Sequence, residues 1–349
     1  MILSFYDKDF IGLQNNASLL VDDKSFKLVK RPIEMNDFNC TCEPFTENIQ
    51  PTFIVVKNDR GSNKELVYSC LAGIPELTAE NKTEINGTDL KALFSSEVVL
   101  QYGTYTNVSQ VISYIFQEWD NQVNRGYINC SLEFKGGAEL VGLDTLVPNT
   151  EKGIFNALDE IKNYLNAYNL YIDSEIDLIG KQVKFYIGKT ISTEKPLKIR
   201  LKDYGVRNYG KWVADVNEVE AYYLNGENWE KGLTWILTSD NQVTVTEELR
   251  DIYPIKKRII TSTESLNQAN IGALQELLGY RYNENLTIPS VGLNVSFETK
   301  FNIILEDGRE YKSLPCGELI YDTSGLVQVQ IGYRYTGVDF IWHLKKVMK

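Results

Sequence analysis

The chain has 349 residues with 36 basic and 47 acidic side chains, so its formal net charge is −11. At about 150 residues per domain, this length predicts two to three domains, each able to bury its own core. The acidic balance excludes stable nucleic-acid binding, and no apolar run reaches the roughly 18 residues of a membrane span. The N-terminus has neither a basic nor a long apolar stretch, so we expect no signal peptide and synthesis in a cytoplasm.

Residues 1–103 have the pattern of β-strands. Residues 25–30 alternate between apolar and polar side chains. Two apolar runs at 52–56 and 66–70 flank a polar turn, which predicts a hairpin, and residues 98–102 predict one more strand. We therefore predict a β domain over 1–103.

The hydrophobic period changes near Thr106. A stripe at helical spacing predicts a helix over 107–119, capped by Thr106 or Asn107, with the apolar residues Val108, Val111, Ile112, Ile115, Phe116 and Trp119. A second predicted helix carries Ile154, Leu158, Ile161, Leu165 and Tyr168. Residues 127–134 predict a strand between the helices, and 170–172 with 183–187 predict a hairpin after them. These elements predict an inserted α/β module over 104–190.

Strand patterns return after residue 197. Residues 217–224, the turn Asn225-Gly226 and residues 233–237 predict a hairpin that 242–246 extends. A helix is expected over 262–278, with Thr261 and Glu264 at capping-box spacing and Gly279 at its end. Its predicted stripe is Leu266, Ala269, Ala273 and Leu277.

We therefore predict a second β domain with a long helix over 191–290. Residues 301–305, 326–333 and 338–344 predict a C-terminal β segment over 291–349. The predicted fold class is α+β, with two β-barrel-like domains, the inserted α/β module and this further β segment.

Few residues of this sequence have the type and spacing needed for catalysis or for binding a metal or phosphate. His343 is the one histidine, which argues against Ser-His-Asp and Cys-His hydrolysis. The 5 cysteines, Cys40, Cys42, Cys70, Cys130 and Cys316, lack the paired spacing of a zinc site, so we expect buried reduced thiols. The Gly188-Lys189-Thr190 triplet lacks the leading glycine of a phosphate loop, because Val183 stands there.

Two acidic patterns are weaker candidates. Asp173, Glu175 and Asp177 begin a calcium-loop pattern that fails at Leu178 and Lys184, so we interpret them as a solvated turn. Two carboxylates for glycoside hydrolysis could come from the pairs Asp22-Asp23, Glu247-Glu248 and Glu306-Asp307. We predict no enzyme activity and no catalytic, cofactor-binding or metal-binding residues.

Four segments carry a resemblance to a known family. They are the helix start at 107–112, the hairpin at 222–229, residues 251–258, and 285–288 after the long helix. Together with the order of the domains, they resemble the tail-tip or baseplate hub proteins of siphophages, in a short form without a C-terminal lysin. The resemblance covers nearly the whole chain and rests on element order rather than on a sharp motif.

The resemblance implies a structural protein of the virion, located at the tail tip. It implies a homotrimeric ring that docks on a hexameric distal tail protein and closes or continues the tail tube for DNA passage. The tape measure protein and receptor-binding proteins are the other partners it implies. Because a passing DNA duplex should not adhere, we expect the inward face of the ring to be acidic, with Glu218, Glu220, Glu247 and Glu248 contributing.

Two other classes remain open. The chain has 21 tyrosines and 5 tryptophans, whose rings stack on sugars in glycan-binding and receptor-binding proteins, although aromatic residues also fill sheets. A shared exposed cleft with Trp229 and Trp235 would favour glycan binding, and burial of both would favour packing. A glycoside hydrolase is the third class and needs two carboxylates roughly 5–10 Å apart in a groove.

Overall fold

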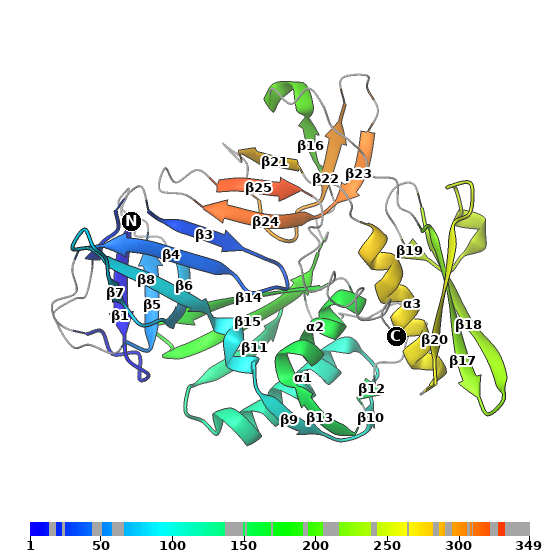
Figure 1. Cartoon of the computed structure of the whole chain (residues 1–349), viewed down its shortest axis with the longest axis horizontal. Helices are drawn as coiled ribbons and strands as arrows, with labels where there is room; N and C mark the ends of the chain where they lie inside the picture. Colours follow the sequence, from blue (N-terminus) through cyan, green and yellow to red (C-terminus); the bar gives the residue numbers. More distant parts are fainter. Residues whose placement is uncertain are drawn as a thin grey trace. The chain divides into compact units, whose positions relative to one another are not determined.

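The protein divides into two compact units in a computed structural model (Figure 1). Unit 1 comprises Met1–Lys189, Pro289–Gly292 and Glu318–Gln328, and unit 2 comprises Thr190–Ile288, Leu293–Gly317 and Val329–Lys349. The described residues are 1–13, 19–22, 25–43, 51–57, 66–136, 149–150, 152–168, 170–190, 195–204, 216–238, 243–263, 265–281, 286–289, 295–305, 308, 310–321 and 327–331.

Strands dominate over helices in these residues, which is consistent with the predicted α+β class. Every sheet in the described part of the chain has two free ends, so the two β-barrel-like domains that the sequence predicts are not closed barrels. None of the helices described is long and apolar enough to cross a membrane.

Unit 1 contains most of the described strands and two of the three described α-helices. Its strands are β1 Ile2–Tyr6, β2 Leu19–Leu20, β3 Lys27–Lys30, β4 Asp37–Cys42, β5 Phe53–Lys57, β6 Leu66–Ala72, β7 Glu76–Leu77, β8 Thr83–Asp89, β9 Glu97–Leu100, β10 Gly103–Thr104, β11 Cys130–Phe134, β12 Asn149–Thr150, β13 Gly153–Asn156, β14 Leu170–Asp177 and β15 Gln182–Lys189. Its helices are α1 Val108–Trp119 and α2 Ala157–Ala167, with the 3₁₀ turn η1 Leu90–Phe94 and the π-helical turn η2 Asp120–Asn124.

The largest sheet of unit 1 follows the order β2-β1-β5-β6-β8-β4-β3-β24, where β24 is Cys316–Tyr321 and β7 pairs with β8. The predicted hairpin of β5 and β6 is confirmed by their antiparallel register. Strand β5 is buried on both faces: Ile54 and Val56 belong to one apolar cluster, and Phe53 and Val55 belong to another. This two-sided burial explains why β5 is a continuous apolar run instead of an alternating one.

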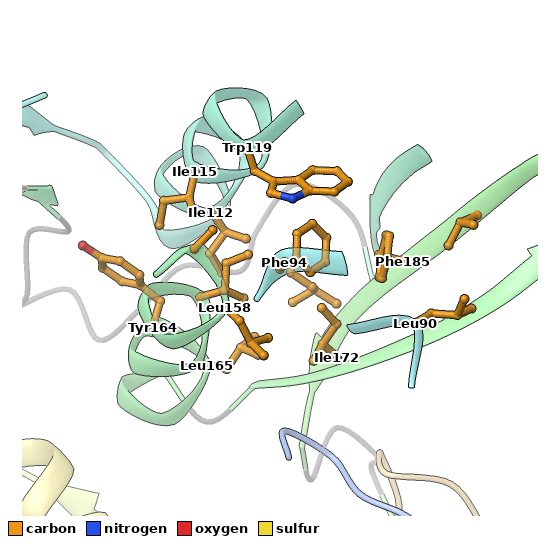
Figure 2. Close-up of a cluster of buried hydrophobic side chains, with 14 of the residues drawn as sticks. Leu90, Phe94, Ile112, Ile115, Trp119, Leu158, Tyr164, Leu165, Ile172 and Phe185 are labelled. Atoms are coloured by element: carbon orange, nitrogen blue, oxygen red, sulfur yellow. The ribbon is translucent and has the colours of Figure 1, made fainter. Parts of the chain in front are cut away.

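The predicted helix over 107–119 is α1. Its N-cap is Asn107, whose side chain accepts a hydrogen bond from the Gln110 N–H. Val111, Ile115 and Trp119 are buried, as the stripe predicts. Figure 2 shows Trp119 above Phe94, and the two rings meet edge to face at 4.7 Å between centroids. The indole N–H of Trp119 donates to the Leu93 carbonyl at 2.8 Å, so the polar group of this large side chain is hydrogen-bonded within the core.

The same apolar cluster joins residues from both sides of the predicted boundary at 103/104. Phe94 lies between Trp119 of α1 and Phe185 of β15, and Phe53 of β5 belongs to the same cluster. The boundary itself stays a prediction. Packing across it makes these two segments interdependent for their stability.

Several details of the 104–190 segment differ from expectation. The predicted hairpin is confirmed as the antiparallel pair β14 and β15, and the strand within 127–134 is confirmed as β11, which pairs with β15 in parallel. Ile154 does not lie on a helix: it is an exposed residue of β13, because α2 begins only at Ala157. Asn156 precedes that helix and accepts from the Leu158 and Asp159 N–H groups, so a capping residue overrides the apolar spacing.

Unit 2 is built on two sheets and one long helix. Its elements are β16 Leu197–Arg200, η3 Leu201–Tyr204, β17 Glu218–Asn225, β18 Asn228–Leu237, β19 Val243–Thr244, η4 Glu247–Leu249, β20 Lys257–Ser262, α3 Leu266–Arg281, β22 Phe301–Ile304 and β23 Glu310–Leu314. The sheet orders are β16-β22-β23 and β19-β18-β17-β20, and α3 packs on β17, β18 and β20 (Figure 1). Strands β21 Leu286–Pro289, β24 and β25 Val327–Ile331 each contain one unit boundary.

The predicted hairpin of unit 2 is confirmed, with its turn one residue later. Asn225 pairs with Asn228, so the loop residues are Gly226 and Glu227. Gly226 has φ +65°, a left-handed conformation that favours glycine at this first loop position.

The boundaries predicted for the long helix were wrong at both ends. Thr261 belongs to β20, and α3 starts at Leu266 and continues past Gly279 to Arg281. Pairing of β20 with β17 extends the strand through Ser262, so tertiary pairing outweighs the local capping signal. The predicted stripe is confirmed at Ala269, Ala273 and Leu277, which are buried. The expected strand over 338–344 lies outside the described residues.

The core position of Trp119 gives a stability prediction. Replacing Trp119 with alanine removes a fully buried indole and its hydrogen bond, so we expect a loss of about 3–5 kcal/mol in the free energy of unfolding. Chemical denaturation followed by far-UV circular dichroism measures this loss. Val123→Ala, at an exposed position beyond α1, is the matched control and should change stability by about 0.5 kcal/mol or less. A loss below about 1 kcal/mol for Trp119→Ala would contradict the packing of α1.

Candidate functional site

The residues most suited to catalysis or metal binding are mostly buried or paired with another side chain. In the described part of the chain, no group of three or more histidine, cysteine, aspartate or glutamate residues has the arrangement of a metal site. Cys40, Cys42, Cys70 and Cys316 are buried free thiols and Cys130 is half-buried, which fits the expected reduced thiols. Burial raises the pKa of Cys40 to about 12, so this thiol is unreactive near neutral pH. His343 lies outside the described residues.

The calcium-loop candidate is a strand, and its interpretation as a solvated turn was wrong. Asp173, Glu175 and Asp177 are alternate residues of β14 and share one face of the sheet. Each accepts from a neighbour: Asp173 from Lys30 at 3.0 Å, Glu175 from the Tyr186 hydroxyl at 2.5 Å, and Asp177 from Lys184 at 2.8 Å. The alternation that suggested a metal loop is therefore the polar face of a sheet. The Gly188-Lys189-Thr190 triplet also belongs to a strand end, since Gly188 and Lys189 end β15.

The acidic pairs give no hydrolase geometry in the described residues. Asp22 forms an ion pair with Lys82, while Asp23, Glu306 and Asp307 lie outside the described residues. Glu247 and Glu248 are exposed on η4.

A buried ion pair holds the connection between β3 and β4 in unit 1. The Lys91 ammonium lies 3.2 Å from the Asp89 carboxylate, and both side chains are inaccessible to solvent. Asp89 also accepts from the N–H of Asn36 at 2.7 Å, and Lys91 donates to the carbonyls of Arg31 and Glu34. Burial lowers the pKa of Lys91, and the Asp89 carboxylate opposes that effect.

Residues 31–37, which we call the β3–β4 connection, also form hydrogen bonds with other elements of unit 1. Arg31 donates to Glu318 of β24 at 3.0 Å and to Asp37 at 2.6 Å, which lowers the pKa of Asp37. Lys162 of α2 donates to Glu34 at 2.6 Å, and the Ile172 N–H of β14 donates to the Pro32 carbonyl at 2.8 Å. This connection is thus fixed by groups from η1, α2, β14 and β24.

A polar depression of about 400 Å³ lies beside this connection. It is lined by Lys27, Met35, Asn36, Asp37, Phe38, Asn39, Asn86, Gly87, Thr88 and Asp89. Phe38 is the one aromatic residue of this lining, and its ring is buried between Phe26 and Tyr68. The depression therefore offers no exposed ring on which a sugar could stack.

In unit 2, one face of the β19-β18-β17-β20 sheet is sealed by α3. The buried Trp235 donates its indole N–H to the Asn270 carbonyl of α3 at 3.1 Å. A Cβ on Gly232 would lie 2.3 Å from the Asn270 side-chain oxygen, so glycine is required for this close approach. Arg258 of β20 forms an ion pair of 2.6 Å with the buried Glu276 of α3.

The opposite face of this sheet carries Glu218 and Glu220, and it corrects the expectation of an acidic inward face at these two residues. Both glutamates are buried. Glu218 pairs with Arg250, and Glu220 accepts from Lys231 at 2.8 Å and from Lys257 at 3.1 Å. Lys231 and Lys257 lower the pKa of Glu220. Because each carboxylate has its own cation, neither adds net negative charge to the surface.

The two tryptophans on which the glycan hypothesis depends differ in how far they are buried. Trp235 lies beneath α3, whereas Trp229 is 52% exposed near the end of the β17–β18 hairpin. They form no shared exposed cleft, so the observation that would favour glycan binding is not met. Sequence reasoning gave no sign of this difference, because both residues lie in the same strand.

Comparisons with known proteins identify the fold. No protein-family model matches the sequence, and no curated protein matches it. The crystal structure of the prophage tail protein gp18 from Listeria monocytogenes EGD-e superimposes with a TM-score of 0.62 over 100% of this chain and 99% of that chain, at 12% identity. This chain has the fold of a phage tail protein.

Two further tail proteins give the same result. The 43 kDa tail protein of prophage MuSo2 from Shewanella oneidensis has a TM-score of 0.56 and 13% identity, over 96% of this chain and 98% of that chain. The tail protein from Neisseria meningitidis MC58 has a TM-score of 0.54 and 11% identity, over 96% of each chain. At these identities the likeness establishes the fold alone, and it extends over the whole tail protein in each case.

The buried Asp89–Lys91 pair gives a second stability prediction. Asp89→Asn leaves Lys91 without its anionic partner, so we expect a loss of about 3–5 kcal/mol. Asp37→Asn removes a carboxylate that is mostly exposed and should cost about 1 kcal/mol or less. Urea denaturation of both variants measures the difference. The double variant Asp89→Asn/Lys91→Met should be more stable than Asp89→Asn alone, and equal losses for Asp89→Asn and Asp37→Asn would contradict the role of the buried pair.

The Glu220 cluster gives a pH prediction. The pKa of Glu220 in the folded chain lies below its unfolded value of about 4.3, so the ion pairs contribute stability above that pH and lose it as pH falls through the folded pKa. Lys231→Met should raise the pKa of Glu220, measured by NMR titration of its carboxyl carbon, and should weaken the fall in stability with acid. Lys198→Met is the control, because the Lys198 side chain is 62% exposed and its ammonium lies 3.7 Å from Glu310 instead of contacting Glu220. An unchanged Glu220 pKa would contradict the assignment.

Proposed function

We propose that the protein is a structural component of a phage tail, a baseplate hub at the tail tip of a siphophage particle. The observation that carries this proposal is the shared fold, which matches three tail proteins over at least 96% of both chains. A likeness confined to one module would point only to a common building block. Here the superposition extends over nearly the whole of each chain.

In this proposal, three copies form a ring that docks on the hexameric distal tail protein. The β-rich segments 1–103 and 191–290 of each copy act as two ring modules, and 104–190 is the inserted module. The ring closes or continues the tail tube, with the tape measure protein and receptor-binding proteins as further neighbours in host attachment. Open sheet ends support this arrangement, since unpaired strand edges favour association with further chains.

The ring is proposed to let DNA pass during ejection without binding it. The net charge of −11 per chain supports this role, because a phosphate backbone is repelled by an acidic protein. With Glu218 and Glu220 neutralised, exposed carboxylates such as Glu247 and Glu248 remain as contributors to an acidic channel.

Glycan binding is the second candidate function, and one observation favours it. Trp229 exposes about half of its surface, and an exposed indole can stack on a sugar ring. Because Trp235 is buried, Trp229 is the member of this tryptophan pair that can stack on a sugar. We propose the structural role ahead of it, and propose no enzymatic activity.

The mass of the protein in solution tests the proposed ring. Multi-angle light scattering of the purified full chain should show a species of three times 39.9 kDa whose fraction grows with protein concentration. The proposed ring is a closed cyclic assembly of three identical chains, so its mass identifies it. A stable dimer that does not convert to a trimer at high concentration would contradict the hub proposal.

A further inference from the structure

The sequence contains two Asn-Gly pairs, Asn86-Gly87 and Asn225-Gly226. Asparagine is chemically labile, and a following glycine makes it more so, because glycine has no side chain to shield its backbone nitrogen or to restrict its rotation. The two pairs have the same local chemistry. Their structural settings differ, since the first lies inside β8 of unit 1 and the second lies at the tip of the β17–β18 hairpin of unit 2.

The reaction open to such a pair is deamidation, which needs only the chain and water. Hydroxide removes the glycine N–H proton, and the nitrogen lone pair attacks the side-chain carbonyl carbon of the asparagine. The bond from that carbon to its own nitrogen breaks, and this nitrogen leaves as ammonia with a proton from water, which regenerates the hydroxide. Water then opens the five-membered ring at either carbonyl and gives aspartate or isoaspartate. Because the attack is intramolecular, its rate depends on whether the backbone can bring the two atoms together.

Asn225 and Gly226 can reach this geometry. Both residues are exposed, and no heavy atom beyond the adjacent residues lies within 4 Å of the point that a Cβ on Gly226 would occupy. Asn225 forms the last pair of the β17–β18 ladder, with Asn228, and Gly226 lies in the loop beyond it. Rotation that brings the Gly226 nitrogen to the Asn225 side chain therefore breaks only the terminal pair, and the ends of strands open at little cost in free energy.

Asn86 also has an exposed side chain, so exposure does not separate the two sites. The difference lies in the backbone. Gly87 is paired on both sides, with Phe38 of β4 and Ala72 of β6, and the Asn86 carbonyl accepts from the Gly73 N–H at 2.9 Å. Rotation at Asn86 would break pairs to two neighbouring strands in the interior of the large sheet. Such an opening costs part of the stability of the sheet, so reaction at Asn86 is suppressed.

The hairpin tip is sensitive to this reaction because the Asn225 side chain is bonded across the strands. Its nitrogen donates to the Glu230 carboxylate at 2.7 Å. Deamidation removes that nitrogen and leaves a carboxylate, so Glu230 loses a donor and meets a like charge. Glu227 is exposed in the same loop and adds a further carboxylate to the tip. Isoaspartate also adds one methylene to the main chain, which displaces the terminal pair with Asn228.

We propose that Asn225 is a site of spontaneous modification in this protein, at which deamidation converts the amide to a carboxylate and loosens the tip of the β17–β18 hairpin. Asn86 is the matching pair that the fold protects. Backbone pairing makes the selection, because both pairs have the same two residues and both asparagine side chains are exposed. The site is independent of the proposed ring, since the reaction needs one chain and water.

Ageing of the purified full chain at mildly alkaline pH tests this proposal, because hydroxide starts the reaction. Anion-exchange chromatography should resolve a growing species with one more negative charge. Peptide mapping by mass spectrometry should place the change at Asn225, with isoaspartate among the products. Conversion at Asn86 should be at least about tenfold slower, because the sheet must open first. In concentrated urea both sites should convert at similar rates, since the backbone pairing that separates them is then lost.

The loosened tip has its own measurement. In the isolated acidic species, amide hydrogen exchange over residues 223–230 should be faster than in the unmodified chain, while exchange in β8 should be unchanged. Equal exchange at the hairpin tip in the two species would contradict the proposed effect on the hairpin.

Two variants with the same substitution control for composition. Asn225→Gln should abolish the acidic species, because a side chain longer by one methylene does not close the five-membered ring. Asn228→Gln should still form it, because Asn228 precedes Trp229, whose side chain shields its backbone nitrogen. Equal rates at Asn86 and Asn225 in the folded chain would overturn the proposal. Conversion of Asn225 in urea with none in the folded chain would also overturn it.

Discussion

The packing of unit 1 depends on one ammonium group that is buried in an apolar interior. Lys91 is fully buried, and an unpaired buried charge costs several kcal/mol. The chain meets this constraint with the Asp89 carboxylate and two carbonyls of the β3–β4 connection, at Arg31 and Glu34. Those contacts fix the connection, and the connection in turn binds α2 through Lys162 and β14 through Ile172. One satisfied charge therefore links the large sheet of unit 1 to the helices beside it.

Unit 2 uses charge in a related way on its sheet. Glu218, Glu220 and Glu276 are all buried, and each is paired with a cation from another element. Carboxylates that the sequence suggests for an acidic surface are thus paired with cations inside the unit. Net charge is a property of the whole chain, and it does not say which carboxylates face solvent.

The proposed role of this protein depends on its fold and its surface more than on reactive side chains. The fold matches tail proteins along its whole length, and the calcium-loop candidates Asp173, Glu175 and Asp177 lie on a sheet face, each bonded to a neighbouring side chain.

The sequence alone determined the elements whose signals are local. The stripe from Val108 to Trp119 with Asn107 as its cap defined α1, and Gly226 marked the β17–β18 hairpin, because periodicity and turn conformation act over a few residues. Only the tertiary structure decided the rest. It extended β20 through Thr261 by pairing with β17, placed Asp173–Asp177 on a sheet face, and buried Trp235 while exposing Trp229 in the same strand. Each of these outcomes depends on a partner distant in sequence, and no local pattern encodes which side of a strand that partner will cover.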